Sequence, residues 1–591
     1  MKLDGVTLRL SATDLANHLA CRHLTGLDRG AAEGLWKPPE WFRPDAEVLR
    51  QRGLEHERAY LAHLERQGVA ITRLDEGAPA SEALARTRAA MQSGAPAIAQ
   101  ATLAAGRWFG RADLLLRVER PSELGAWSYE PLDTKLARET KAGAILQLCL
   151  YADLLRETQG ALPDRMYVAP KRPEFPVEDY RVADYLAYYR LVRRRLEAAV
   201  DEAAPATYPE PVPLCEICRW WPRCDRQRRA DDHLSFVAGI SRLQMRELQS
   251  RRIDRLAALA VEPLPLAWKP SRGATEGYGR AREQARVQLA GRTQQKSLHE
   301  LLGFQPGHGL ARLPEPSPGD LFLDLEADPY VDEGGLEYLF GWAIADPPPE
   351  GTLALDVGPP VYHSRWALDR SAERRGFEAV MDAILERWET DPNMHVYYFG
   401  AYEPGALKRL MGRYGTREAE MDRMLRSGRF VDLHVVVRQS LRASVEEYSI
   451  KKLEPLYGFT REQPLEAAGA ALRVMERALE LGYAVASDDE HARVVEAYNR
   501  DDCLSARALR DWLETLRSAA IAEGAEIERP KEDEGAPSES VGDRERRTGE
   551  LAERLLEGVP EDERERTDEQ RARALLAHLL DWHRREEKAS W

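Results

Sequence analysis

The sequence contains no long apolar run. No stretch approaches the ~18–20 consecutive apolar residues that a membrane-spanning helix requires. The initial segment MKLDGVTLRLSATDL also has no apolar region typical of a secretory signal. Apolar residues at 43% and aromatic residues at 8% are globular values. We therefore expect a cytoplasmic protein, and its 591 residues predict two or three domains with linkers.

A phosphate-binding loop is also absent. The sequence has no G-x-x-x-x-G-K-[ST] and no Gly-Lys pair, so we expect no ATP-binding loop in it. The net charge of −15 at first argues against a nucleic-acid partner, but net charge does not describe local fields. Basic clusters recur at Arg193–Arg195, Arg219–Arg229 and Arg242–Arg255. A phosphate track and a solvated helix face explain them equally well.

Cysteine is scarce, and its spacing is informative. Six cysteines in a cytoplasmic chain do not predict a disulfide framework. Cys215-x2-Cys218-x5-Cys224 follows a proline-rich turn, while Cys21 is isolated on a predicted N-terminal helix. Four thiolates from the two ends of one domain could bind a single metal centre. Zinc and an iron–sulfur cluster both use four thiolates, so the spacing alone leaves the two open.

Three polar motifs follow one another within about forty residues. The apolar segments Leu114–Leu116 and Trp127–Leu136 predict buried strands, and positions i and i+2 of a strand share a face. Carboxylates beside a lysine at a strand end predict a Mg²⁺ or Mn²⁺ site that can hold a phosphate and activate water. A single Asp-x-Lys is common, whereas this order of three motifs is not. The motifs are Gly110-x-x-Asp113, Asp133-x-Lys135 and Gln147-x3-Tyr151.

This order resembles the RecB-like branch of the PD-(D/E)xK nucleases, which have a restriction-endonuclease-like α/β fold. The family places a metal-binding histidine on an upstream helix, and His56 fits that position. The resemblance therefore implies that His56, Asp113 and Asp133 bind the metal. Glu55 or Glu57 could take the place of His56.

The resemblance also implies roles for the remaining residues of the motifs. Lys135 would steady the attacking water or the phosphate, and Gln147 and Tyr151 would line the site. One distant cysteine, Cys21, followed by C-x2-C-x5-C after the Q-x3-Y helix is similar to the iron–sulfur RecB-like nucleases. The resemblance therefore implies a [4Fe–4S] cluster held by all four cysteines, with Zn²⁺ as the alternative.

A second group of acids follows the linker Pro306–Asp320. The segment Leu321-Phe-Leu-Asp324-Leu-Glu326 predicts a buried strand that directs both acids to one side. Such a carboxylate pair is costly unless cations compensate it. Tyr498 and Asp502 are four residues apart on a predicted helix and share a face.

These motifs resemble those of the DEDD exonucleases of the RNase H-like fold. Asp324-x-Glu326 matches their first motif, and Tyr498-x3-Asp502 matches the tyrosine form of their third. The resemblance implies that Asp324, Glu326 and Asp502 bind metal and that Tyr498 orients water.

The middle DEDD motif departs from the family pattern. The family has Asn-x-x-(Phe/Tyr)-Asp, whereas this chain has Phe399-x-x-Tyr402-Glu403. Glu403 can still bind metal, but its extra methylene shifts its oxygens by roughly an ångström in a two-metal site whose metals are ~3.5–4 Å apart. Asp432 is expected either in a strand that braces the site or as a helix-cap or turn acid.

Together the motifs predict an α/β multidomain protein. It resembles a family that joins an iron–sulfur PD-(D/E)xK domain to an RNase H-like domain, and whose longer members continue into a helicase. We expect the PD-(D/E)xK domain with its cysteine cluster at 1–232, a helical connector at 233–315 and the RNase H-like domain at 316–520. A charged linker (Glu526–Arg547) and a helical tail would occupy the rest of 521–591.

The predicted function is that of a divalent-metal-dependent DNA nuclease, an exonuclease by resemblance, in repair, recombination or defence. DNA and a helicase, in a separate or a longer chain, are the expected partners. A non-catalytic nucleic-acid-binding adaptor with vestigial sites is one alternative. An RNA-directed nuclease is another, because RNase H-like folds serve both polymers.

Overall fold

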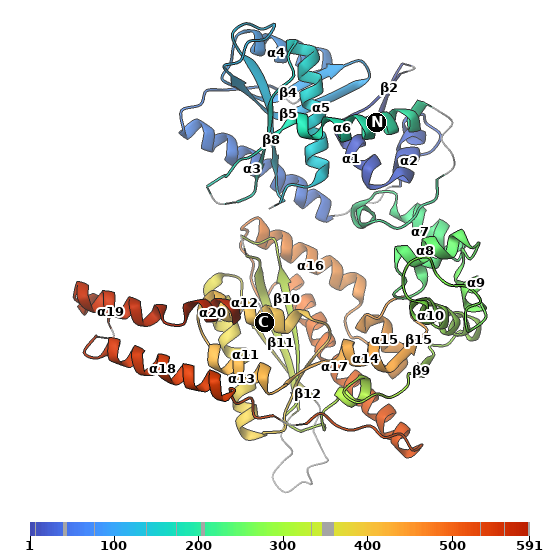
Figure 1. The fold of residues 1–591 in the computed structure, drawn as a ribbon, viewed down its shortest axis with the longest axis vertical. Coiled ribbons are helices and arrows are strands. Elements are labelled where there is room, and N and C mark those ends of the chain that lie inside the picture. Colours follow the sequence, from blue (N-terminus) through green and yellow to red (C-terminus); the bar gives the residue numbers. More distant parts are fainter. Residues whose placement is uncertain are drawn as a thin grey trace. The chain divides into compact units, whose positions relative to one another are not determined.

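The chain forms two compact units, Met1–Ser235 and Phe236–Trp591 (Figure 1). The computed structural model describes residues 1–5, 7–39, 44–75, 77–137, 139–172, 174–201, 207–332, 334–345, 360–531, 533–560 and 562–588. Each unit has its own sheet and core, so the architecture is mixed α/β and multidomain, as the sequence predicts. Among the described residues, no helix is both long and apolar enough to cross a bilayer.

The first unit is built on a six-stranded sheet in the order β3-β4-β5-β6-β7-β8. β4, β5 and β6 are antiparallel neighbours, and β6 and β7 are parallel. Its elements are β1 (Lys2–Asp4), β2 (Thr7–Arg9), α1 (Ala12–Ala20), α2 (Arg22–Ala32), α3 (Pro44–Arg66), β3 (Ile71–Arg73), α4 (Ala80–Gln92), β4 (Ala97–Ala105), β5 (Trp108–Val118), β6 (Ser128–Lys135), α5 (Ala142–Gln159), β7 (Arg165–Pro170), β8 (Glu178–Arg181), α6 (Val182–Asp201), the 3₁₀ helix Pro213–Ile217 and α7 (Trp221–Ala230).

Helices cover both faces of this sheet. On one face, α1, α4, α5 and α6 pack over a core that includes Trp108 and Leu148. On the other face, Tyr60 and Leu61 of α3 pack against Leu114 and Leu132. Tyr129 of β6 packs into the first of these cores and Leu132 into the second, so the strand is buried on both faces although half of its residues or more are polar.

The second unit is built on a five-stranded sheet in the order β12-β11-β10-β13-β14, with β10 at its centre. β10 is antiparallel to β11 and parallel to β13. Its elements are α8 (Arg242–Ser250), α9 (Leu256–Ala260), α10 (Thr275–Gln294), β9 (His299–Leu301), β10 (Leu321–Asp328), β11 (Leu336–Ala345), β12 (Pro360–Trp366), α11 (Arg370–Thr390), β13 (Val396–Tyr398), α12 (Tyr402–Tyr414), α13 (Glu418–Arg426), β14 (Phe430–Asp432), α14 (Leu433–Ser440), β15 (Leu441–Ala443), α15 (Ile450–Tyr457), α16 (Leu465–Glu480), α17 (Glu490–Ala522), α18 (Glu539–Leu556), α19 (Asp568–Leu579) and α20 (Trp582–Lys588).

Side chains alternate along β10, so its leucines lie on one face and its acids on the other. Leu321, Leu323 and Leu325 point into the core formed with α11, α12 and α13. Phe322 belongs to the opposite core, which α14, α15 and α17 share. Asp324 and Glu326 alternate with the leucines, so β10 presents both acids toward α17.

Local structure differs from the sequence prediction in four places. Cys21 is not inside a helix: it ends α1 and caps α2, because its sulfur accepts the Leu24 N–H. β5 extends well beyond the predicted Leu114–Leu116, since pairing with β4 continues to Trp108. Strand β12 was not predicted, because the polar residues His363, Ser364 and Arg365 interrupt its few apolar ones. The predicted linker Glu526–Arg547 is helical from Glu539, where α18 begins.

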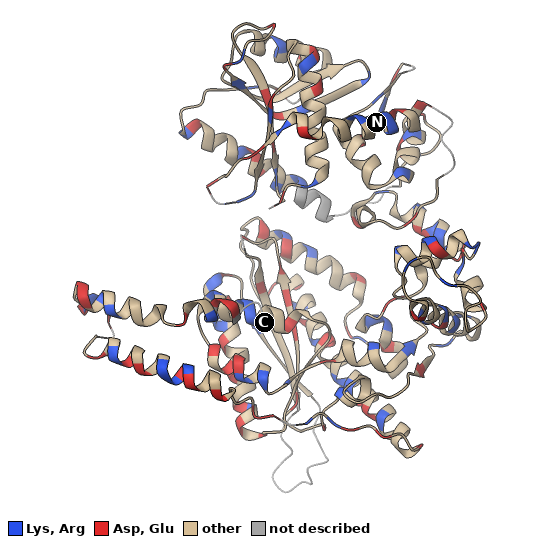
Figure 2. Cartoon of the chain, in the orientation of Figure 1, with Lys and Arg blue, Asp and Glu red and all other residues tan. Residues whose placement is uncertain are grey.

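Acidic and basic residues alternate along the C-terminal helix α18, whereas α19 carries its charges in its first half (Figure 2). Pairs such as Arg546–Asp543 and Arg571–Asp568 stabilise these helices at i, i+3 spacing. Charged helix faces therefore account for part of the excess acid beyond residue 520.

Candidate active sites

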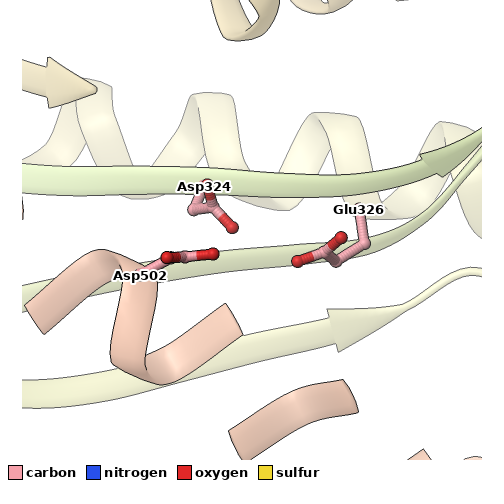
Figure 3. Close-up of side chains that lie close together, drawn as sticks. All are labelled: Asp324, Glu326 and Asp502. Atoms are coloured by element: carbon pink, nitrogen blue, oxygen red, sulfur yellow. The ribbon is translucent and has the colours of Figure 1, made fainter. Parts of the chain in front are cut away.

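Three carboxylates of the second unit lie together at the centre of its sheet. Asp324 and Glu326 come from β10 and Asp502 from α17, and their side chains point toward one another (Figure 3). One oxygen from each lies within 4.8 Å of the others. Among the described residues this is the only group of three His, Cys, Asp or Glu ligand atoms so close together. Oxygen ligands at this spacing suit Mg²⁺ or Mn²⁺.

Asn499 holds the first of these carboxylates in position. It lies one turn before Asp502 on α17, and its amide Nδ2 donates to Asp324 Oδ2 at 2.7 Å and to the Asp324 carbonyl at 3.2 Å. Tyr362 Oη on β12 donates to Asn499 Oδ1 at 2.8 Å. Gly341 is paired with Asp324 in the sheet, and a Cβ there would lie 1.6 Å from Asn499 Oδ1. Any larger residue at position 341 would therefore clash with the Asn499 side chain.

Two cations hold Asp502. Lys451 Nζ on α15 donates to Asp502 Oδ2 at 3.1 Å, and Arg461 donates to Asp502 Oδ1 at 2.6 Å. Arg461 also binds Glu454, which fixes its position. Lys451 lies 5.0 Å from the centroid of the Tyr498 ring. The predicted Tyr498–Asp502 pair is therefore joined by a lysine, and burial raises the pKa of Tyr498.

Burial and mutual repulsion raise the pKa values of the carboxyl groups in this site. Burial, followed by the charge of Asp502, raises the pKa of Glu326 to about 8. The same two causes raise the pKa of Asp324 well above its usual range, with Glu326 and Glu403 adding to it. Lys451 opposes both shifts but does not cancel them. A divalent cation would supply the missing positive charge.

Glu403 lies beside the three carboxylates but outside their 4.8 Å group. It is in the first turn of α12 and 4% exposed, and its Oε2 is buried without a hydrogen-bond donor. Burial, then Asp432 and Asp502, raises the pKa of Glu403 to about 8. Asp432 caps α14 by accepting the His434 N–H at 2.8 Å and also accepts the Gly400 N–H at 3.1 Å. It thus acts as the predicted cap and also steadies the turn before α12.

The first unit brings its predicted acids together on β5 and β6. Asp113 Oδ2 accepts the backbone N–H and the hydroxyl of Thr134, both at 2.8 Å. The neighbouring Asp133 is fully buried and forms an ion pair with Lys135. Gln147 on α5 donates to Asp133 Oδ1 at 3.1 Å and accepts from Lys135 Nζ at 3.2 Å.

Tyr151 completes this arrangement. Its hydroxyl accepts from Gln147 Nε2 at 3.0 Å and donates to the Arg111 carbonyl at 2.7 Å. The ring packs on Gly110, where a Cβ would lie 2.5 Å from Tyr151 Cε1. The glycine of the first motif is therefore required by the tyrosine of the third.

Backbone strain accompanies Asp113. The pairing of β4 with β5 is interrupted at Gln100 and Asp113, and Gln100 has φ 58° in the left-handed region. Ala112 and Leu114, two residues apart, pack into different cores, so the side chains of β5 change faces at Asp113. A non-glycine residue in this region costs about 1 kcal/mol or more, and such strain is common at functional sites.

His56 lies on α3 near Asp113, as predicted. Its Nε2 is 3.0 Å from the Ala169 carbonyl, which can only accept, so Nε2 carries the proton and Nδ1 is free of it. Burial lowers the pKa of His56 and keeps it neutral, the form that binds metal. Of the alternatives, Glu55 is exposed and Glu57 binds Gln100. His56, Asp113 and Asp133 do not bring their ligand atoms within 4.8 Å of one another.

The charges of this site are nearly balanced without a metal. Burial, then the Asp113 charge, raises the pKa of Asp133 to about 8, although Lys135 opposes the shift. Burial lowers the pKa of Lys135, but Asp133 and Asp113 outweigh it and the net shift is upward. The lysine is therefore charged and bound to its acid.

Cys21, Cys215, Cys218 and Cys224 line one pocket of the first unit, together with apolar side chains that include Leu24 and Trp220. No three of their sulfurs lie within 4.8 Å of one another in the described residues, so they form no compact cluster. Backbone N–H groups of Leu24 and Val212 donate to the sulfurs of Cys21 and Cys215, both at 3.4 Å. Burial raises the pKa of Cys224 to about 11.

Three residues of the second site were not predicted from the sequence: Asn499, Lys451 and Arg461. Asn499 could have been found, because it shares the buried face of α17 with Asp502. Lys451 interrupts an apolar helix pattern between buried Ile450 and Leu453, which is a weaker signal. Arg461 lies in a loop without a pattern of its own.

A family model described as the RNase_H superfamily matches residues 321–514, about a third of the chain. No curated protein matches the sequence. The matched region begins at β10 and includes Asp324, Glu326, Glu403, Tyr498 and Asp502. This part of the chain is an RNase H-like domain, and the superfamily comprises nucleic-acid-hydrolysing enzymes. Its acidic triad suits the divalent metals that such nucleases use.

Proposed function

We propose that this protein is a divalent-metal-dependent nuclease that hydrolyses phosphodiester bonds of DNA. One observation carries the proposal: Asp324, Glu326 and Asp502 place carboxylate oxygens within 4.8 Å of one another inside an RNase H-like domain. Three carboxylates this close repel one another when they are ionised, and a bound cation removes that repulsion. A phosphodiester substrate fits, since it is an anion that binds through the same cation.

In the second site the triad and Glu403 would hold Mg²⁺ or Mn²⁺. The metal supplies positive charge to the phosphate and lowers the pKa of bound water. Asn499 keeps Asp324 oriented, and Lys451 with Arg461 keeps Asp502 oriented. Tyr498 orients the attacking water through its hydroxyl. The buried and unpartnered Oε2 of Glu403 supports its role as a further ligand.

In the first site, His56, Asp113 and Asp133 would hold a metal of the same kind. Lys135 would exchange its ion pair with Asp133 for the negative charge that develops on the phosphate. Gln147 would hold Lys135 and Asp133 in position through its hydrogen bonds to both, and Tyr151 would hold Gln147. The assembly of these six side chains from four elements, α3, β5, β6 and α5, supports a PD-(D/E)xK-type nuclease domain at 1–232.

The four cysteines would bind a [4Fe–4S] cluster in this domain. Four thiol donors and the N–H groups aimed at two of them suit an anionic cluster. Sulfurs around one Zn²⁺, at ~2.3 Å from the metal, would all lie about 3.8 Å apart, whereas no three of these sulfurs, all from described residues, lie within 4.8 Å of one another. Anaerobically purified protein should be brown, absorb near ~400 nm and contain iron and sulfide. Colourless protein with one zinc per chain would contradict the cluster.

We further propose the remaining organisation as the sequence suggests it. Residues 233–315 serve as a helical connector, 316–520 as the exonuclease domain and 521–591 as a charged segment with helices. DNA is the substrate, in repair, recombination or defence, and a helicase acts with it in a separate or a longer chain.

The test is a Mn²⁺-dependent cleavage assay on single-stranded DNA with wild type, Lys135→Ala and Asp324→Ala. Each variant should lose the cleavage of its own site, about 10²–10³-fold, so the double variant should be inactive. Asp382→Asn is the matched control, since Asp382 is a partly exposed acid of α11 that pairs with Arg417. Equal residual cleavage in all variants would contradict the proposal and favour a non-catalytic adaptor. Faster cleavage of a matched RNA strand would favour the RNA-directed alternative.

A further inference from the structure

A second cleft opens beside the candidate site of the first unit. Its volume is about 420 Å³, and the N-terminal hairpin β1–β2, the start of α1 and the first residues of β5 form its walls. Backbone bonds fix these walls to each other: Leu10 N donates to Arg107 O and Phe109 N donates to Leu10 O, both at 2.9 Å. The cleft is therefore part of the folded unit.

The polar lining of this cleft is basic. It includes Lys2, Arg9, Thr13 and Arg111. Arg9 is paired with Asp4 at 2.6 Å, but both side chains are exposed, 40% and 60%, so the pair is weak and exchangeable. The lining acid Asp14 is buried, and Ser11 binds it through its backbone N–H and hydroxyl at 2.8 and 2.7 Å. The remaining charged side chains of the lining, Lys2, Arg9 and Arg111, are positive.

The cleft is joined to the candidate site through two residues. Tyr151 lines the cleft and is hydrogen-bonded to Gln147, which binds Asp133. Tyr151 also donates to the carbonyl of Arg111, which precedes Asp113 by two residues on β5.

An aromatic ring also lines the cleft. Phe109 on β5 is half-buried and adjoins the basic residues. Grooves that bind single strands combine cations for the backbone with rings on which bases stack. The cleft has both, and it shares Tyr151 with the candidate site.

We propose that this cleft binds the single nucleic-acid strand next to the phosphodiester that the first site cleaves, an inference that rests on the proposed function of that site. Lys2 and Arg9 bind backbone phosphates, Arg111 binds the phosphate nearest the acids, and a base stacks on Phe109. The cleft thereby sets the position of the strand at Asp113 and Asp133.

The test measures binding and cleavage separately. Binding of a fluorescent single-stranded DNA oligonucleotide is followed by anisotropy in Ca²⁺ at several salt concentrations. For Lys2→Gln/Arg9→Gln we expect a Kd about ten-fold higher and a salt slope smaller by about 1.4, since each phosphate contact on a single strand contributes ~0.7. Phe109→Ala should also weaken binding about ten-fold. In the Mn²⁺ assay KM should rise while kcat stays within two-fold.

Arg88→Gln is the matched control, because Arg88 is exposed on α4 and lines no part of the cleft. An unchanged Kd and salt slope in the cleft variants, with cleavage still sensitive to Lys135→Ala, would overturn the cleft and leave the nuclease standing. Weaker binding without any cleavage sensitive to Lys135→Ala would retain the cleft as a binding site and reject the nuclease. A matched RNA oligonucleotide that alone responds to the variants would reject DNA as the occupant.

Discussion

The two acid sites of this chain handle negative charge in different ways. In the first unit, Lys135 pairs directly with the fully buried Asp133, and one amide, Gln147, bridges both. In the second unit, Asp324, Glu326 and Glu403 have raised pKa values, and both cations are directed to Asp502. The first site therefore has one carboxyl group with a raised pKa, Asp133, and a lysine bound directly to it, whereas the second has three such groups and directs its cations to a fourth acid.

The largest expected difference is the response of metal affinity to pH. At each group whose pKa is raised to about 8, metal displaces a proton, so affinity for Mn²⁺ should rise about ten-fold per pH unit below 8. Asp133 contributes one such group to the first site. Glu326 and Glu403 contribute two to the second, and the raised pKa of Asp324 adds to them, so its affinity should rise at least about a hundred-fold per unit. Titration calorimetry from pH 6 to 8 measures the Mn²⁺ affinity of each site. Asp324→Asn removes binding at the second site while the first is measured, and Asp113→Asn removes binding at the first site while the second is measured.

The same groups predict the sign of the stability change without metal. At these carboxyl groups the folded state holds protons that the unfolded state releases between about pH 4.5 and 8, so their contribution to the free energy of unfolding should fall as the pH rises through this range. Urea unfolding in EDTA checks this. A pH-independent metal affinity at both sites would remove the contrast between them.

The next largest effect concerns the lysines. Lys135→Met leaves Asp133 buried without its cation and should lower the free energy of unfolding by about 3 kcal/mol at pH 9. The loss should be smaller at pH 6, where Asp133 takes up a proton. Lys451→Met leaves Arg461 on Asp502 and should cost only about 1 kcal/mol. Denaturant unfolding measures both, with Lys452→Met, an exposed neighbour, as the control. Equal losses would contradict the view that only the first site depends on a single cation.

A smaller effect tests the geometry of the second site. Gly341→Ala brings a methyl group against Asn499, and relieving the clash should cost about 1–3 kcal/mol of unfolding free energy. It should also displace Asp324 and weaken Mn²⁺ binding at the second site alone. Gly279→Ala is suited as a control, because nothing lies within 4 Å of a Cβ there. Normal Mn²⁺ binding in Gly341→Ala would mean that Asn499 does not position Asp324.

The smallest effect distinguishes a brace from a ligand. Asp432→Ala removes the α14 cap and the bond to Gly400, at about 1 kcal/mol of unfolding free energy. Since Asp432 holds the turn before Glu403, Mn²⁺ affinity should fall only a few-fold. Asp432→Asn should restore most of the stability because asparagine also caps helices. A loss of affinity as large as that of Asp324→Asn would assign Asp432 to the metal instead.

The sequence pattern was sufficient to predict which site residues share a face where they lie close together on one strand or helix. Asp133 and Lys135, Asp324 and Glu326, and Tyr498 and Asp502 are each related by a strand or helix period, and each pair shares a face in the fold. Strand β12 and the helical start of α18 were missed because their apolar residues are few and tertiary packing decides them. The position of Cys21 between two helices was missed for the same reason.

The sequence by itself determined the central strand β10, the helix α17 and the acids that each presents, because alternation and helical periodicity need only neighbouring residues. Tertiary structure alone decided that Lys451, Arg461 and Asn499 meet those acids, and that Cys21 shares a pocket with cysteines almost two hundred residues away. Local periodicity says which face a side chain occupies, but only the packing of the sheets and helices says which faces meet.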